Sequence, residues 1–309
     1  MNAKKRQADD SSVAVADKPA RRAGGHRMVG AAILLAALAG GSYAVWQQVR
    51  GHVMAGEEYQ IDPARVTITP PPAWIHADVK SEVLREATFE GPLSLLDGDL
   101  TVRMASAFSA HPWVAHVERV SKHFPAGLDV VLSYRKPVAM VEVEGGAGAL
   151  PVDGDGVVLP TQDFSPADAD AYPRIGEIHT TPAGDVGTPW GDECVVGAAQ
   201  IAAALANDWK TLGVFRIVPA GQKSGRSGVE PVFSLMTHSG AKIGWGRAPA
   251  TSMPGEVPAV EKIAQLKCYA AQNNGSLELP GGEHLEIRAD GALLSRPRPE
   301  VKPLPKNGE

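Results

Sequence analysis

Two short segments of the chain combine a serine with a lysine at a spacing that some acyl-transfer enzymes use. Ser133 precedes Lys136 by three residues, and Ser239 precedes Lys242 by three residues. In those hydrolases the serine opens a helix, whereas the sequence predicts a strand around Ser133 and a tight turn around Ser239. The sequence also has no Gly-x-Ser-x-Gly elbow and no His-Glu-x-x-His segment. We therefore expect no enzyme and keep an anchored envelope hydrolase only as an alternative.

Metal ligation is equally poorly supported by the residue types. The segment Asp153–Asp155 is similar to the start of a calcium loop, but the next oxygen ligand would have to come from Val157. His111, His116 and His123 are the nearest approach to a histidine cluster, yet their spacing crosses a helix end and a strand and gives them no common face. The sequence therefore predicts neither a metal site nor a cofactor.

The composition is that of a globular protein. The chain has 309 residues, of which 44% are hydrophobic and 21% are charged, and this length suggests two domains. The formal net charge of −5 argues against nucleic-acid binding, which needs clustered bases. Only two cysteines occur, so a disulfide framework and a Cys-based zinc cluster are excluded. Cys194 and Cys268 can form one disulfide or remain as two small buried thiols.

A basic N-terminal tail precedes an uncharged apolar segment. Residues 1–27 carry a net charge of +4, and Met28 to Trp46 contains no formal charge. This segment is long enough to cross a bilayer, and the bases before it keep the N-terminus in the cytoplasm by the positive-inside rule. We therefore predict a cytoplasmic basic tail (1–27), a transmembrane helix (28–48) and a linker (49–60). The alternative is a signal peptide cleaved after Ala37-Leu38-Ala39.

Residues 61–144 have the pattern of a small α+β domain. A short strand is expected near Arg65–Ile68, and Asp78 can cap a first helix. A second helix from about Asp99 places apolar residues four apart and ends at His111-Pro112. Alternating residues then predict strands up to and beyond Pro137. The expected order is β-α-α-β-β, with two helices on one face of a sheet.

Residues 145–292 read as a mainly β domain with two flanking helices. A hairpin is expected around Asp153–Gly156, and the two helices carry apolar stripes centred on Ala198 and Leu266. Further strands are predicted at 214–218, 232–237, 241–245 and 285–288. Residues 293–309 contain several prolines and are predicted to be an extended, solvated tail. The overall fold class is therefore α+β, preceded by one transmembrane helix.

The run from Leu100 to Val143 resembles the FtsQ/DivIB family of bacterial cell-division proteins, in which a POTRA domain and a β-domain follow a single span. The segment Pro151–Val158 is also similar to the start of that family's β-domain. The Tyr134-Arg135-Lys136 segment departs from the family because its usual acidic residue is missing. The residues that carry the resemblance in the POTRA-like domain are Pro112, Trp113, Val114, Arg119, Pro125, Arg135 and Pro137.

The resemblance implies a non-enzymatic scaffold of the septum-forming machinery. Such a protein is held in the inner membrane with most of its chain in the periplasm, and it is expected at the division site. Its partners are other division proteins, among them a small bitopic coiled-coil protein that pairs with the last β-strand. Plain core packing is the other interpretation of Leu285 and Ile287. Carried over by position, the partner-binding residues are His284, Leu285, Glu286, Ile287, Arg288, Gly291 and Leu294.

One other class of envelope protein fits the predicted domains. A POTRA-bearing protein for export or outer-membrane assembly would share the anchor and the first domain. Such proteins usually carry several POTRA units or a barrel, and the sequence shows neither repeated units nor the alternating strands of a barrel. We keep this function as an alternative.

Overall fold

A computed structural model describes the fold of most of the chain after the N-terminal tail. The described residues are 25–54, 59–89, 93–143, 148–220, 230–238, 240–251, 253–273, 275, 277, 284–287 and 293–296. The chain divides into two compact units, Met1–Glu57 and Glu58–Glu309. The fold class is α+β: one apolar N-terminal helix and a mainly β body.

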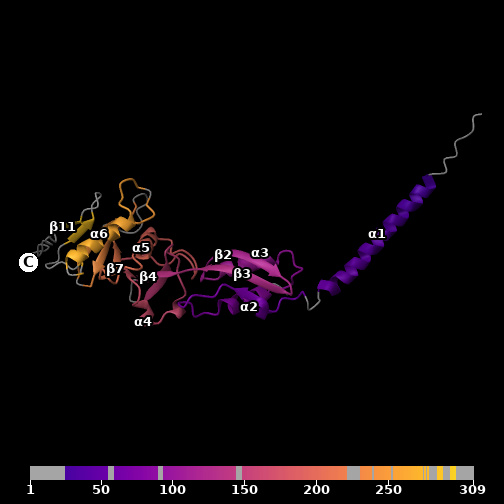
Figure 1. The fold of residues 1–309 in the computed structure, drawn as a ribbon, viewed down its shortest axis with the longest axis horizontal. Helices are drawn as coiled ribbons and strands as arrows, with labels where there is room; N and C mark the ends of the chain where they lie inside the picture. Colours follow the sequence, from indigo (N-terminus) through magenta and orange to yellow (C-terminus); the bar gives the residue numbers. More distant parts are fainter. Residues whose placement is uncertain are drawn as a thin grey trace, which may run out of the picture. The chain divides into compact units, whose positions relative to one another are not determined.

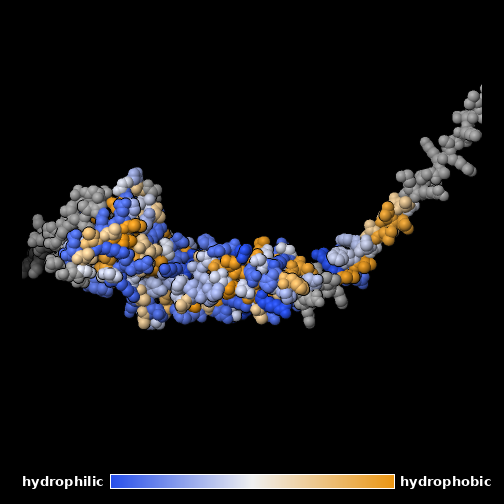
Figure 2. All heavy atoms as spheres, viewed as in Figure 1, coloured by the Kyte–Doolittle hydropathy of each residue, from blue (hydrophilic) through white to orange (hydrophobic). Residues whose placement is uncertain are grey.

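The first unit contains helix α1 (Gly25–Met54). Its segment Val29–Arg50 is the only helix among the described residues that is long and apolar enough to cross a membrane. Figure 2 shows hydrophobic residues along much of α1, and large side chains such as Leu35 and Trp46 are exposed. The segment agrees closely with the predicted span of 28–48. By its length and composition it could serve as a membrane anchor or as a signal sequence.

The first part of the second unit is built on a three-stranded sheet. Its strands are β1 (Val66–Ile68), β2 (Val114–His123) and β3 (Gly127–Tyr134), in the order β1-β3-β2. β1 runs parallel to β3, whereas β2 is antiparallel to β3. Helices α2 (Val79–Phe89) and α3 (Leu100–Ala110) lie between β1 and β2 in the sequence. The expected β-α-α-β-β order is therefore present (Figure 1).

Both helices follow from local sequence signals. The Asp78 carboxylate accepts a hydrogen bond from the Ser81 backbone N–H (3.1 Å) and caps α2. In α3, Leu100, Met104 and Phe108 recur every fourth residue and are completely buried. The backbone N–H of His111 donates to the Phe108 carbonyl oxygen, and the next residue is Pro112, which cannot continue a helix. The predicted start and end of α3 are therefore confirmed.

The second part of this unit is an eight-stranded sheet with the strand order β11-β10-β9-β8-β7-β6-β4-β5. Two short helical segments, a 3-10 helix at Thr161–Asp163 and α4 (Pro166–Ala169), precede β6. The strands are β4 (Pro137–Glu142), β5 (Ala149–Asp153), β6 (Arg174–Ile175), β7 (Val214–Pro219), β8 (Val232–Thr237), β9 (Lys242–Arg247), β10 (His284–Ile287) and β11 (Leu293–Arg296).

Two longer helices cover the core of the large sheet. Helix α5 (Glu193–Ala204) packs against β4 and β7, and helix α6 (Ala259–Gln272) contacts α5 and β11. The predicted apolar stripe of α5 is buried, as are Ile263 and Leu266 of α6. These side chains join Trp190 and Trp245 in one hydrophobic cluster. The two predicted flanking helices are therefore confirmed.

Strand β4 is placed differently from the prediction. The sequence assigned residues 137–144 to the first domain, but β4 pairs with β5 and β6 in the large sheet. Val138 to Val141 are all buried, so this strand is covered on both faces. A strand that is covered on both faces reads as a continuous apolar run and carries no signal of which sheet it joins. The change of sheet therefore falls between Tyr134 and Pro137, and both sheets belong to one compact unit.

Candidate functional site

The predicted partner-binding strand lies inside the large sheet, so its assignment as an edge is wrong. Strand β10 pairs in parallel with β9 on one side and antiparallel with β11 on the other. The outermost strand on this side is β11. Of the predicted residues, His284 to Ile287 form β10 and Leu294 lies in β11, opposite Glu286. Arg288 and Gly291 fall outside the described residues.

Core packing explains the central residue of β10. Leu285 is almost completely buried, and it lies between Ile243 of β9 and Ser295 of β11. Glu286, by contrast, is exposed, and Ile287 is half-buried. A proline at position 285 would remove a ladder donor inside the sheet and replace a buried side chain, so it would damage the fold rather than test an edge. A test of partner binding should instead change residues of β11.

Strand β11 was missed because its four residues adjoin the proline-rich tail and were read as part of it. Arg296, its last residue, is followed by Pro297. One sequence signal could have found it. Asp290-Gly291 separates two short apolar segments, and an Asp-Gly pair in that setting is a strong indication of a hairpin. The boundary predicted between the β-domain and the tail therefore cuts through a strand pair.

Strand β11 is the outermost strand on one side of the large sheet, and no further strand pairs with it among the described residues. At the opposite edge of the large sheet, β5 has Val158 bridged to its Val152. In the small sheet, β1 has three residues, and β2 has irregularities near His116 and Glu118 that interrupt its ladder with β3. Bulges of this kind blunt an edge. The β10–β11 ladder shows no shift in register, so β11 offers a regular edge for an added strand.

A buried charge cluster fixes the strand that supports this edge. Lys262 of α6 is 2% exposed, and its ammonium group lies over the Trp245 ring of β9, 4.9 Å from the ring centroid. The Glu256 carboxylate accepts hydrogen bonds from Lys262 and from the backbone N–H of Arg247 (3.0 Å). Gly246 has a φ of +92°, and a side chain there would collide with Glu256. The cluster therefore holds α6 against β9, the strand that pairs with β10.

The surroundings of Glu256 also set its pKa. Burial raises the pKa of this carboxyl, but the hydrogen bond from Lys262 and the one from the Arg247 backbone N–H outweigh that effect. The pKa is therefore held below its usual value. The carboxylate stays ionised in neutral solution and keeps the charge of Lys262 balanced in the core.

The residues of the POTRA-like motif mostly meet where the two sheets join. The indole Nε1–H of Trp113, a fully buried residue, donates to the Asp163 carboxylate (2.6 Å). The Trp113 ring also packs against Phe164, with the ring centroids 6.1 Å apart. Trp113 begins the approach to β2, whereas Asp163 and Phe164 follow β5 in the sequence. This residue therefore fastens the small sheet to the long connection between β5 and β6.

Arg135 makes a second set of links at the same place. Its guanidinium pairs with the Asp153 carboxylate at 2.8 Å, and both side chains are largely shielded from water (17% and 6% exposed). Its backbone N–H donates to the Trp113 carbonyl oxygen, and its own carbonyl accepts from the Trp74 indole. Asp153 also accepts from the backbone N–H of Val157. The Asp153–Asp155 segment is thus a turn stabilised by an ion pair. We call Trp113, Arg135, Asp153 and Asp163 the joint.

The other motif residues divide between the joint and more distant positions. Pro112 packs so closely against Gly187 that a side chain at position 187 would collide with it. The φ of +93° at Gly187 also favours glycine. Val114 and Pro137 begin β2 and β4 and are buried. Arg119 is exposed on β2, opposite Val131. Pro125 lies in the turn between β2 and β3. The structure therefore brings five of the seven predicted motif residues to the junction of the sheets.

Residues considered for catalysis and metal binding are used structurally or lie apart. Ser133 is paired with His116 in the small sheet, and Ser239 is outside the described residues. His111 contacts Glu82 at 3.2 Å. No group of three or more potential metal ligands occurs within the described ranges. Neither cysteine is in a disulfide: Cys194 is buried, whereas Cys268 is exposed. The possible disulfide is therefore not formed, and only one of the two thiols is buried.

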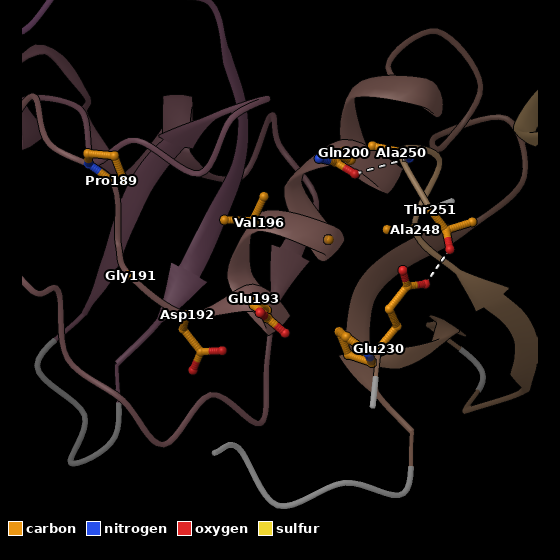
Figure 3. A pocket seen from close by; sticks show the side chains of 12 residues that line it. Pro189, Gly191, Asp192, Glu193, Val196, Gln200, Glu230, Ala248, Ala250 and Thr251 are labelled. Carbon is orange, nitrogen blue, oxygen red and sulfur yellow. Dashed lines mark hydrogen bonds between the residues drawn. The ribbon is translucent and has the colours of Figure 1, made fainter. Parts of the chain in front are cut away.

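A hollow of about 370 Å³ lies beside the start of α5 (Figure 3). Asp192 and Glu193 line one side, and Glu230 lies across from them. Asp192 caps α5 through the Cys194 backbone N–H (2.8 Å) and also accepts from the Thr180 hydroxyl group. Glu230 accepts a hydrogen bond from Thr251. The hollow is acidic and two of its carboxylates are engaged, so it offers no nucleophile paired with a base.

The described residues therefore provide a strand edge at β11 and a joint held by hydrogen bonds and an ion pair. They contain no assembled catalytic group. Comparisons with known proteins add no family to this description. No protein-family model matches the chain, and the search of the curated proteins found no match.

Proposed function

We propose that this protein is a non-enzymatic scaffold of the bacterial septum-forming machinery, anchored in the inner membrane by α1 with its N-terminus in the cytoplasm. The exported unit then carries a POTRA-like domain, built on the small sheet, and a β-domain, built on the large one. The observation that carries the proposal is the regular outer edge of β11, at the end of the large sheet. A chain with one apolar helix and such an edge is suited to holding a partner at a membrane surface.

Two further observations support this assignment. The order β1-α2-α3-β2-β3 agrees with a POTRA-like domain directly after the apolar helix. The residues that resemble the FtsQ/DivIB run do not form a catalytic cluster but fasten this domain to the β-domain. Fastened domains would present two interaction surfaces at a constant spacing, as a scaffold requires.

The partner we infer is a small bitopic coiled-coil protein that adds a strand to β11. Backbone N–H and C=O groups on the outer side of an edge strand bind an extended segment with little demand on sequence. Specificity then comes from side chains beside the edge, of which Glu286 is exposed on the neighbouring strand. This places the contact one strand further out than the sequence suggested.

The first test is the position of the protein in dividing cells of its native host. A fluorescent protein fused to the N-terminus would lie in the cytoplasm, where it can fold. We expect a band at the constriction. An even signal around the envelope would contradict the division proposal and favour the export or outer-membrane assembly alternative, which would then be tested by searching for a co-purifying barrel protein.

The second test addresses the edge itself. A photoreactive amino acid at Leu294, which lies opposite the exposed Glu286, should form a crosslink of defined mass to a small membrane protein in living cells. The same amino acid at Val260, which is 78% exposed on α6, serves as the control and should give none. Equal yields at both positions would show that β11 is not a preferred contact.

A further inference from the structure

Two large hydrophobic side chains are exposed at one end of the small sheet. Phe124 lies in the turn between β2 and β3 and is 75% exposed, and Leu96 lies in the loop before α3 and is 41% exposed. Lys122 connects the two places, because its ammonium group donates to the carbonyl oxygens of Leu95 (3.1 Å) and Asp97. We call Phe124 and Leu96 the hydrophobic tip.

The hydrophobic tip differs from the rest of this part of the protein. Among the described residues between 59 and 143, one other large hydrophobic side chain is exposed, Val102 on α3. Scattered exposed aliphatic residues are normal on a protein surface. An exposed phenylalanine in a turn and an exposed leucine in the loop that Lys122 binds can together form a small apolar surface of the kind that contacts another apolar phase.

The hydrophobic tip lies where the chain arrives from α1. The backbone N–H of Leu95 donates to the Tyr59 carbonyl oxygen (2.8 Å), and that of Ile61 donates to the Leu93 carbonyl oxygen (2.9 Å). The first described residues of the second unit therefore run beside the loop that carries Leu96. Lys122 binds this same loop two residues before Phe124.

The covalent chain limits how far this end can move from the apolar helix. The few residues between Met54, at the end of α1, and Tyr59 span no more than about 18 Å when fully extended. The apolar segment of α1 ends at Arg50. If this segment crosses a bilayer, the four helical residues after Arg50 (about 6 Å) and the extended link allow Tyr59 to lie at most about 24 Å from the end of the segment, so the hydrophobic tip is within reach of the outer headgroup region.

We propose that the hydrophobic tip rests in the outer headgroup region of the same bilayer that α1 spans, an inference that rests on the uncleaved anchor of the proposed function. Transfer of the Phe124 ring and the Leu96 side chain out of water drives the contact. Two side chains suffice because the tether makes the contact intramolecular and its effective concentration high. The contact would fix how the small sheet is oriented over the membrane, since it adds a second point of attachment to the anchor.

The test uses the full chain in vesicles of equal parts phosphatidylcholine and phosphatidylglycerol. The exposed Cys268 is replaced by serine, and an environment-sensitive NBD group is attached at His123→Cys, next to the native Phe124. A matched chain carries the NBD group at Val260→Cys on α6, where the exposure is close to that of Phe124. Quenching by lipids with a doxyl group near the headgroup then reports contact with the bilayer.

We expect quenching at position 123 to exceed that at position 260 at least threefold. Phe124→Ser should remove most of this difference, whereas Val102→Ser should leave it unchanged. Equal quenching at 123 and 260, in chains that float with the vesicles, would overturn the contact while leaving the anchor intact. A chain that does not float with the vesicles would overturn the anchor, and this inference with it.

Discussion

The joint and the β10–β11 pair are held together in opposite ways. At the joint, side chains from distant parts of the sequence are buried and bonded to one another, as in the Trp113–Asp163 and Arg135–Asp153 pairs. The β10–β11 pair consists of two four-residue strands in register. Strand β11 is held by this short backbone ladder and by contacts with α6, and no strand pairs with its other side among the described residues.

This difference separates the residues that hold the fold together from those that we propose bind a partner. Residue types that stand out in a sequence, such as tryptophan and arginine, are used here to fix one sheet to the other. The surface that we propose for partner binding needs few distinctive residues, because backbone groups do the binding. Substitutions at the joint should therefore change stability more than binding, and changes in β11 should do the reverse.

Trp113→Ala should have the largest effect on stability. Removing a fully buried indole leaves a cavity and an unpaired buried carboxylate at Asp163, and we expect the free energy of unfolding to fall by about 3–5 kcal/mol. Urea denaturation of the second unit, Glu58–Glu309, measures this. Trp113→Phe, which keeps most of the ring but deletes the hydrogen bond, should cost less than half as much. Equal losses in the two variants would contradict the cavity explanation.

Asp153→Asn should have the next largest effect. The change removes the charge opposite Arg135 in a largely buried pair, and we expect a loss of about 2 kcal/mol. The asparagine side chain can still accept from the Val157 backbone N–H, so the turn itself is retained. The same denaturation experiment applies. A loss that disappears in high salt would show that the pair is more exposed to water than the structure indicates.

Glu256→Gln tests the charge cluster behind β9 and should cost about 1–2 kcal/mol at pH 7. Because the folded-state pKa of Glu256 is lowered, its stabilising effect is present above the ordinary carboxyl pKa of about 4.3. The effect is lost as the pH falls through the lowered value. The stability difference between wild type and variant should therefore shrink in acid. A difference that grows below pH 4 would contradict this sign.

A proline that removes a ladder donor of β11 should cost about 1 kcal/mol of stability, close to one lost hydrogen bond. Neighbouring residues of a strand point their N–H groups to opposite sides. Leu294→Pro and Ser295→Pro therefore delete donors on opposite sides of β11. One of the two variants loses a donor to the β10 ladder, and the other loses a donor on the outer side. The variant that lacks the outward donor should lose most of the crosslink formed by a photoreactive amino acid at Leu293. Full crosslinking in both folded variants would contradict an added strand.

Asp170→Asn should have the smallest effect. Asp170 pairs with Arg174 at 2.6 Å, but the two side chains are 76% and 26% exposed. A pair of this kind contributes less than about 0.5 kcal/mol. Thermal unfolding compared with that of Asp153→Asn gives the contrast between an exposed and a buried carboxylate. A loss as large as that of Asp153→Asn would show that burial does not decide the effect of these pairs.

The sequence predicted elements whose signals are local. The four-residue spacing in α3, the apolar stripe of α5 and the strand-like runs that form β7 to β9 are all patterns within short segments of the sequence. The sheet to which β4 belongs could not be identified, because its residues are buried on both faces and its pairing partners lie far away in sequence. The joint was missed for a similar reason: nothing near Trp113 in the sequence points to Asp163.

Parallel pairing of β9 and β10 has a consequence for the order of folding. A parallel pair needs a crossover, and α6 forms part of the connection between these strands. Strand β10 therefore cannot pair with β9 before the segment that contains α6 has been made, and β11, its neighbour on the other side, comes later still in the sequence. If the chain folds as it is made from its N-terminus, the outer edge is the last part of the sheet to be completed. The edge at which we propose that a partner strand is added would then form only once the rest of the sheet is in place.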